Sequence, residues 1–337
     1  MKTITCVIAI LISSLAFAKG SIAVGFDQII LYADSDRPLK TSLWYPTTES
    51  FPKDLIADNR AFAGTRVVRI GQPANGSYPL VVMSHGYRGN WRNQNWLAMK
   101  LVQAGYIVAA VDHPGTTSFN HDPNLAKQWW ARPGDISRLL DWLLERSDLR
   151  RHLDPQRISA IGHSLGGWTV MALAGAKVDI EQLAEACRPT PNSRVCGLRG
   201  EFGMLEASES AHNNLKDSRI KKLVSLDLGL AKSFSLQSLS ELTRPTLILA
   251  AGIDIGDLPQ QQESGFLAQY LPQQTTQYKV YSNASHFSFM QLCKPGAIEL
   301  LEEEVPGDGI ICLNEPNTSR EALHDTIFQD ILAFLSS

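Results

Sequence analysis

The chain has 337 residues, of which 44% are hydrophobic and 19% are charged, and its formal net charge is −3. These values are ordinary for a globular protein, and a slightly acidic chain without a basic surface does not predict nucleic acid as a partner. The length fits either two domains or one large α/β domain, so it does not decide the domain count.

The first eighteen residues have the pattern of an export signal. Lys2 precedes an apolar run that reaches about Leu15, and Ala16-Phe17-Ala18 fits a cleavage site. The run is short for a membrane span, and no other stretch approaches eighteen apolar residues. We expect a signal peptide over 1–18 and an exported domain, periplasmic or secreted, over 19–337. No membrane span should be left after cleavage, and a retained anchor is the alternative.

The predicted elements alternate between apolar runs and helical patterns. The expected strands cover residues 26–34, 40–48, 78–86, 107–115, 157–164, 220–229, 245–257 and 276–289. The expected helices cover residues 96–106, 135–148, 165–176 and 320–335. Asp135 is the expected N-cap of the second helix. Strands that are buried on both faces and alternate with helices predict an α/β fold with a mostly parallel central sheet and helices on both faces.

The segment 175–219 interrupts this alternation. It is polar, has no clear period, and contains Cys187 and Cys196. We interpret it as an insertion or cap. Two further cysteines, Cys293 and Cys312, make an even number in an exported chain, which indicates disulfides. Pairing between sequence neighbours is expected, because each bond then closes one local loop. Metal ligation is the alternative, but the chain has no C-x-x-C spacing and no histidine beside these cysteines.

A candidate nucleophile lies where a predicted strand meets a predicted helix. Gly162-His163-Ser164-Leu165-Gly166 matches the G-x-S-x-G pattern, and this junction is the setting that the pattern requires. Strand and helix approach closely around such a bend, so the residues two before and two after the serine must be small. Ser164 is the expected nucleophile. The alternative is an ordinary glycine turn.

Two backbone N–H groups are expected to hold a developing oxyanion. The N–H of Leu165 belongs to the bend itself. The N–H of Tyr87 lies in the stretch SHGYRGN, which follows the strand over 78–86. A plain glycine-rich turn is the alternative for this loop.

His286 is the expected general base, because it follows the last predicted strand and precedes the last predicted helix. We expect His163 to point away from the outer face of the bend, His85 to shape its loop and His113 to line the pocket. Five tryptophans could line an acyl pocket, although bulky aromatic residues more often pack in cores. They are Trp91, Trp96, Trp129, Trp130 and Trp168.

The acid that orients the histidine has two main candidates. Asp254 and Asp227 both follow strands, and both keep the order Ser, Asp, His along the chain. We favour Asp254, because an acid after the penultimate strand should lie closer to the histidine loop. Asp227 is the alternative acid and would otherwise line the pocket or cap a helix. Asp257 is a weaker third candidate.

These stretches resemble the α/β-hydrolase superfamily. The resemblance is carried by SHGYRGN at the oxyanion loop, GHSLGG at the nucleophile, GID at the acid and ASHFSF at the histidine. Within the superfamily the chain resembles exported predicted dienelactone-hydrolase-like proteins, platelet-activating-factor acetylhydrolases and cutinases. This implies a serine hydrolase with a Ser-His-Asp triad that cleaves small-molecule or lipid-like carboxylic esters through an acyl-enzyme. It implies no metal and no organic cofactor.

The sequence also departs from these relatives. Dienelactone hydrolases use a cysteine nucleophile where this chain has Ser164, so their substrate is not carried over. In platelet-activating-factor acetylhydrolases the acid follows the earlier strand, which would correspond to Asp227. An amidase or peptidase with the same triad and a non-catalytic binding protein are the alternative functions. Substrate and oligomeric state stay open.

Overall fold

The computed structural model describes residues 22–49, 54–191, 193–205 and 214–337, so the expected signal peptide lies outside the described residues. The described chain is built on a ten-stranded sheet with the order β10-β9-β8-β7-β5-β6-β2-β1-β4-β3. The strands are β1 (Ala23–Leu31), β2 (Leu39–Thr47), β3 (Asp54–Ile56), β4 (Thr65–Arg69), β5 (Tyr78–Ser84), β6 (Ile107–Asp112), β7 (Leu153–His163), β8 (Lys222–Leu226), β9 (Thr246–Ile253) and β10 (Thr276–Ser285).

The central part of the sheet is parallel, as the sequence predicts. Each neighbouring pair from β10 across to β6 runs parallel. β2 runs antiparallel to both β6 and β1. Because the parallel strands all end at one edge, the loops that follow β5, β7, β8, β9 and β10 meet there. In open sheets of this kind, functional side chains gather at that edge.

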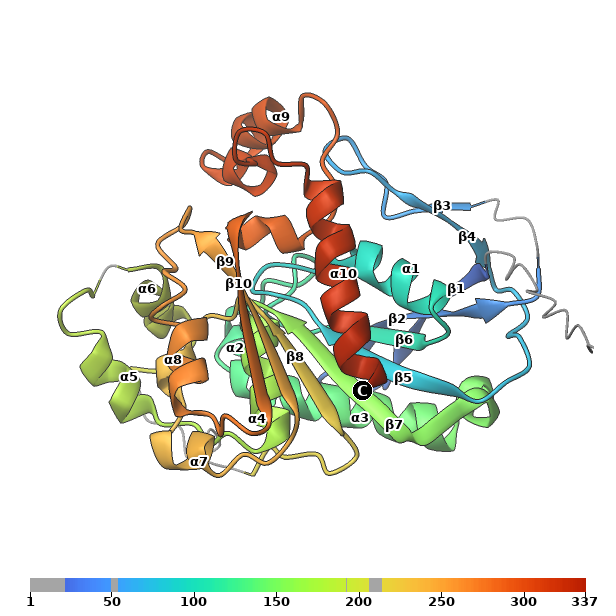
Figure 1. The fold of residues 1–337 in the computed structure, drawn as a ribbon, viewed down its shortest axis with the longest axis horizontal. Helices are drawn as coiled ribbons and strands as arrows, with labels where there is room; N and C mark the ends of the chain where they lie inside the picture. The colour runs from blue at the N-terminus through green and yellow to red at the C-terminus, as the bar shows by residue number, and fades with distance from the viewer. Residues whose placement is uncertain (1–21, 50–53, 192, 206–213) are drawn as a thin grey trace, which may run out of the picture.

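Helices cover both faces of the sheet (Figure 1). The longer ones are α1 (Asn95–Gln103), α3 (Arg132–Glu145), α4 (Leu165–Ala174) and α10 (Arg320–Ser336). Apolar side chains of α3 and α4 pack into one buried cluster, and those of α1 and α10 pack into a second cluster on the opposite face. Two-sided cover explains why the central strands are continuous apolar runs; all six residues of β6 are buried. Trp91, Trp96, Trp129 and Trp168 are buried, which confirms the prediction that bulky aromatic residues of this set pack in the core.

Several shorter elements were not predicted. The remaining α-helices in the described residues are α2 (Pro123–Ala126), α5 (Ile180–Ala186), α6 (Arg194–Glu201), α7 (Leu236–Ser240), α8 (Ser264–Tyr270) and α9 (Ala297–Glu304). Helices α5 and α6 lie in the segment expected to be an aperiodic insertion. Within the described ranges, no helix is both long and apolar enough to cross a membrane.

The expected N-cap of α3 is wrong. The helix begins at Arg132, and Pro133 occupies its first turn, where a missing N–H is tolerated. The Asp135 carboxylate turns inward instead and forms a two-point ion pair with Arg37, with both N–O distances at 2.7 Å. Asp135 is therefore an ion-pair partner of Arg37 and not the N-cap that the sequence pattern predicts.

Both expected disulfides are present. Cys187 pairs with Cys196, and Cys293 pairs with Cys312. The second bond closes a loop segment between β10 and α10 that carries α9, at the top of Figure 1. This segment pairs with the loop between β3 and β4 through a bridge between Phe62 and Cys293.

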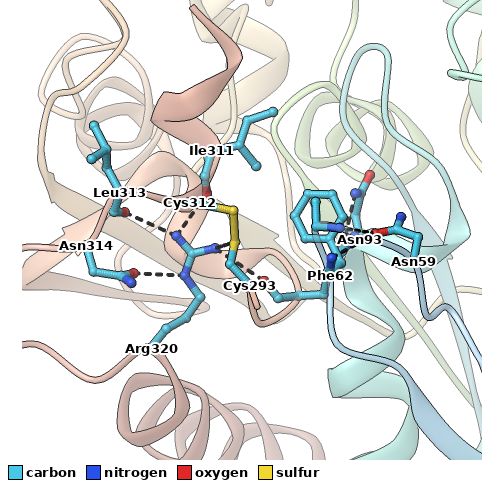
Figure 2. The surroundings of a disulfide bond; sticks show 11 residues. Asn59, Phe62, Asn93, Cys293, Ile311, Cys312, Leu313, Asn314 and Arg320 are labelled. Atoms are coloured by element: carbon cyan, nitrogen blue, oxygen red, sulfur yellow. Dashed lines mark hydrogen bonds between the residues drawn. A yellow bond between two sulfur atoms is a disulfide. The ribbon is translucent and has the colours of Figure 1, made fainter. Parts of the chain in front are cut away.

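Arg320, at the start of α10, contacts this loop segment through its guanidinium (Figure 2). Its guanidinium donates to the carbonyl oxygens of Gln291, Ile311 and Leu313 and to Oδ1 of Asn314. The side chain is buried, and four neutral oxygens take the place that water would have at the surface. The segment that follows the candidate histidine loop is therefore fixed by one covalent bond and one buried cation.

Candidate active site

Ser164 occupies a sharp bend between β7 and α4. Its backbone has φ = 56° and ψ = −122°, a conformation that a residue with a side chain rarely adopts. Its N–H donates to the carbonyl of Leu226 at the end of β8, with an N–O distance of 3.0 Å. The bend leaves the serine side chain partly exposed at the carboxyl edge of the sheet, in front of the N-terminus of α4.

The two flanking glycines are needed for close packing, as the pattern predicts. A Cβ at Gly162 would overlap the carbonyl oxygen of Gly166, and a Cβ at Gly166 would overlap the carbonyl oxygen of Ser84. Both obstacles are backbone atoms, which cannot move aside as a flexible side chain could. The bend therefore tolerates only glycine at both positions.

His286 follows β10 and reaches a carboxylate on another strand. Its Nδ1 lies 2.7 Å from Oδ2 of Asp227. The second carboxylate oxygen, Oδ1, accepts the N–H of Ala251 at 2.8 Å, so the carboxylate is held from both sides. An acceptor at Nδ1 fixes the tautomer with the proton on that nitrogen, which leaves Nε2 as the acceptor. The imidazole keeps 11% of its side-chain surface exposed, against 4% for Asp227.

The expectation that Asp254 contacts this histidine is wrong. Asp254 is exposed, and its Oδ1 accepts the N–H of Leu258 within its own loop. Asp254 is too far along the sheet edge because of the path of the loop that carries His286. This loop follows β10 and crosses the end of β9 to reach the end of β7. There, the carbonyl oxygen of His286 lies 3.0 Å from Nε2 of His163. The carboxylate next to the His286 side chain is therefore Asp227, which follows β8, and not Asp254, which follows β9.

The weaker third candidate acid is also elsewhere. Asp257 is exposed and its Oδ2 accepts the N–H of Arg194, at 3.0 Å. This contact joins the loop after β9 to the first residue of helix α6.

His163 supports the histidine loop from inside the bend. It is buried, and its ring lies 4.6 Å from that of His286, measured between centroids. Burial lowers the pKa of His163 well below its ordinary value, with the nearby His286 as a further cause. A neutral His163 can therefore donate to the carbonyl of His286 without placing a second charge beside it.

His113 does not line a pocket, contrary to expectation. It has no exposed surface, and its two ring nitrogens lie 2.9 Å from Oγ of Ser84 and 2.9 Å from Oδ2 of Asp135. His85 shapes its loop, as expected, with Nδ1 2.7 Å from the carbonyl oxygen of Gly86.

The two N–H groups expected to be oxyanion donors flank the serine. Within the described residues, neither the N–H of Tyr87 nor that of Leu165 donates to another protein group. The loop that carries Tyr87 passes directly beside the bend, because a Cβ on Gly86 would lie 3.0 Å from Cβ of Ser164. Both donors are therefore free to act on a bound atom near Ser164.

The end of helix α6 contacts this loop as well. The Tyr87 hydroxyl donates to Oε1 of Glu201, and the Tyr87 ring meets Phe202 edge-on, with ring centroids 5.0 Å apart. Burial and then Glu201 raise the pKa of Tyr87 to about 12, so the phenol stays a donor at neutral pH. On the other side of the site, Arg194 donates to the carbonyl of Gly256. The segment that carries α6 is thus attached both to the loop after β5 and to the loop after β9.

A buried carboxylic acid that sequence reasoning missed lies behind the acid loop. Glu263 is only 6% exposed, and its Oε2 accepts the N–H of Ala231, four residues after Asp227, at 2.7 Å. Burial raises the pKa of Glu263 to about 8. No local pattern marks this residue, because it precedes a short helix in a polar stretch.

Glu263→Gln is expected to change how stability depends on pH. Between the ordinary glutamate pKa of 4.5 and about 8, the unfolded chain binds fewer protons at this site than the folded chain, so stability falls as the pH rises. Glutamine keeps an acceptor for the N–H of Ala231 but does not titrate. From pH 5 to pH 8 the free energy of unfolding should therefore fall less in the variant than in the parent. The difference is at most ~4 kcal/mol, because one titrating group changes this free energy by ~1.4 kcal/mol per pH unit. Urea unfolding at the two pH values measures this, and an equal loss in both proteins would contradict it.

Three comparisons relate this chain to known proteins. A family model described as PET hydrolase-like matches residues 47–192. Cutinase est1 of Thermobifida alba is 28% identical over 109 residues, which are 32% of this chain and 34% of that protein. A bis(hydroxyethyl) terephthalate hydrolase of Streptomyces coelicolor is 24% identical over 120 residues, 36% of each chain. The alignments thus span about a third of the length of these curated relatives.

A solved structure extends the likeness to nearly the whole fold. A ferulic acid esterase from Streptomyces cinnamoneus aligns with a TM-score of 0.62 at 18% identity, over 96% of this chain and 91% of that one. The chain has the α/β-hydrolase fold. The match to cutinases confirms that part of the resemblance, whereas the resemblances to dienelactone hydrolases and to platelet-activating-factor acetylhydrolases stay predictions. Within the described ranges, the chain has no group of three or more His, Cys, Asp or Glu side chains arranged to hold a metal ion.

Proposed function

We propose that this α/β-hydrolase is a carboxylic ester hydrolase that forms an acyl-enzyme on Ser164. The observation that carries the proposal is the hydrogen bond between His286 Nδ1 and Asp227 Oδ2, at 2.7 Å, on a chain whose serine occupies a strained strand-to-helix bend. A serine hydroxyl is a weak nucleophile until an oriented base takes its proton. Asp227 is the orienting acid in this proposal, in place of Asp254.

The reaction has two halves. In the first, Ser164 Oγ attacks the ester carbonyl while its proton passes to His286 Nε2, and the resulting imidazolium is stabilised by Asp227. The N–H groups of Tyr87 and Leu165 hold the oxyanion, assisted by the positive end of α4. His286 then gives its proton to the departing alkoxide, and the alcohol leaves. In the second half, a water molecule loses a proton to His286 and attacks the acyl-enzyme. The bond to Ser164 Oγ then breaks, His286 returns the proton to that oxygen, and the carboxylic acid leaves.

The Ser164 hydroxyl has no protein hydrogen-bond partner within the described residues. Catalytic hydrogen bonds are often long in ligand-free enzymes and shorten when substrate binds. The proposal therefore requires Ser164 Oγ and His286 Nε2 to come within hydrogen-bond distance in the complex.

The relatives support an ester over an amide as the substrate. The cutinases, the bis(hydroxyethyl) terephthalate hydrolase and the ferulic acid esterase all have names that refer to ester cleavage. We take a small-molecule or lipid-like ester as the substrate class. The protein is exported in this proposal, which its two disulfides support, because such bonds persist in oxidising compartments.

A fluorophosphonate probe tests the proposal directly. We expect one label per chain, mapped by peptide mass to Ser164, together with hydrolysis of p-nitrophenyl esters. Ser84 should stay unlabelled, because it is only 1% exposed. A chain without any label would support a non-catalytic binding protein, and hydrolysis of p-nitroanilides alone would support an amidase.

A further inference from the structure

One buried arginine donates from each of its three guanidinium nitrogens to neutral oxygens. Arg132, in the first turn of α3, has no exposed surface. Its Nε donates to Oγ1 of Thr169 at 3.0 Å, and its Nη1 donates to Oγ1 of Thr116 at 2.6 Å. Its Nη2 donates to the carbonyl of His85 and, at 3.1 Å, to Oγ of Ser84. Within the described residues, no carboxylate lies within salt-bridge distance of this guanidinium.

The acid one turn further along α3 already has its own partners. This acid, Asp135, is paired with Arg37 and His113. Removing a guanidinium from water costs several kcal/mol unless its surroundings compensate. A buried cation without its own counter-ion therefore needs an explanation beyond helix packing.

The arginine joins the three segments that surround the expected oxyanion donors. The carbonyl of Thr116 accepts the N–H of Arg88, next to Tyr87, at 2.9 Å. The Thr169 hydroxyl donates to the carbonyl of Leu165 at 2.9 Å. Through Thr116 and His85 the guanidinium contacts the loop of one donor, and through Thr169 it contacts the helix turn of the other.

The hydrogen-bond directions in this network are determined by its donors. Because Arg132 can only donate to Ser84 Oγ, the serine proton is directed to Nε2 of His113, at 2.9 Å. Nδ1 of His113 then carries the proton that Asp135 accepts. Burial lowers the pKa of His113 well below its ordinary value, in agreement with a neutral ring.

The proton position on His85 follows from its two hydrogen bonds. Its Nε2 accepts the N–H of His113 at 3.0 Å, so its Nδ1 must be the donor to the carbonyl of Gly86. In a trans peptide, the carbonyl of Gly86 and the N–H of Tyr87 point in opposite directions. Anchoring that carbonyl to His85 therefore sets the direction of the Tyr87 N–H.

Ser84, His113 and Asp135 thus have the hydrogen bonds of a Ser-His-Asp triad, but they form a scaffold. All three side chains are buried, at 1%, 0% and 1% exposed. No substrate can reach Ser84, and its oxygen already accepts from Arg132.

We propose that Arg132 is a positioning residue that holds the loop of Tyr87 and the first turn of α4 in register, so that both N–H groups face the same oxyanion. The proposal rests on the proposed ester hydrolysis. A cation enclosed beneath these donors also favours the negative charge that develops in the transition state more than it favours the neutral ester.

Arg132→Met and Arg132→Lys test this assignment. Methionine keeps much of the side-chain volume without the charge or the donors, and lysine keeps the charge without the planar fork. We expect Arg132→Met to lower kcat for a p-nitrophenyl ester roughly 10- to 100-fold with little change in KM, because the donors act mainly on the transition state. Arg132→Lys should fall between this variant and the parent. Amide hydrogen exchange of residues 84–90 should be faster in both variants.

Arg219→Met is the matched control. Arg219 also contacts α3, through Asp141 at 2.6 Å and the carbonyl of Ser137 at 3.1 Å, but it has no contact with the loop 84–90. It should leave kcat within about twofold of the parent and the exchange of residues 84–90 unchanged. Parental kcat and parental exchange in both Arg132 variants would overturn the proposal, as would an equal effect of Arg219→Met.

The two readouts separate this proposal from the proposed function. If the parent chain hydrolyses no ester, the proposed function fails, and the exchange of residues 84–90 still decides whether Arg132 holds the loop. If the parent is active and only the positioning claim is wrong, kcat and exchange both stay at parental values in the Arg132 variants.

Discussion

Ser164→Ala is expected to lower ester turnover by roughly 10⁴- to 10⁶-fold, the range seen when a catalytic serine is removed from a serine hydrolase. The loss follows from chemistry and not from folding, since alanine needs the same positive φ at this bend and adds no atom to it. Initial rates with a p-nitrophenyl ester, at protein concentrations up to the micromolar range, measure the residual activity.

Ser159→Ala is the control for this variant. Ser159 lies on the same strand, β7, five residues before the bend and away from the carboxyl edge of the sheet. Its turnover should stay within about twofold of the parent. A Ser164→Ala protein that keeps a tenth of the parental rate would show that the hydroxyl is not the nucleophile.

Asp227→Asn is expected to lower kcat by roughly 10⁴-fold, because it reverses the tautomer of the histidine. The amide oxygen of asparagine can still accept the N–H of Ala251, so the turn after β8 should keep its shape. The amide nitrogen then faces Nδ1 of His286 as a donor. The ring must carry its proton on Nε2, where it cannot accept one from Ser164.

Asp254→Asn is the matched control for the acid. Asp254 is exposed and accepts only the N–H of Leu258, which an asparagine oxygen can also accept. We expect kcat within about twofold of the parent, with melting temperatures of both variants measured alongside. A large loss confined to Asp254→Asn would contradict the geometry of the site and restore the acid that the sequence favours.

The sequence predicts the central fold and two members of the candidate triad for the same reason. Buried parallel strands are continuous apolar runs, so β5 to β9 and their order along the chain are visible without a structure. Ser164 and His286 follow strands at positions where this order brings them to one edge. The glycines at 162 and 166 are forced by the local bend, which a pattern of five residues can encode.

The acid could not be chosen in the same way. Asp227 and Asp254 both follow apolar strands, and the choice depends on how far the loop after β10 reaches across the sheet. That reach is set by contacts between distant segments, such as the one between His163 and the carbonyl of His286. The spacing of residues along the chain does not indicate how far this loop reaches. The resemblance to platelet-activating-factor acetylhydrolases was the one signal that pointed to Asp227.

Arg132 and Glu263 were missed because burial of a charged residue has no local signature. Glu263 occurs in a polar stretch that is typical of surfaces, and Arg132 follows two tryptophans and an alanine. For both, only the packing of several segments removes the charged group from water. The short strands β3 and β4 escaped prediction for a related reason. Three to five residues are too few to show a period.

The two attachments of helix α6 have a mechanical consequence. The helix contacts the loop after β5 through Glu201 and the loop after β9 through Arg194, while Cys187–Cys196 joins the end of α5 to the first turn of α6. Because this bond is covalent, the first turn of α6 cannot move far from the end of α5. A displacement of α6 from either loop must therefore displace the end of α5 as well.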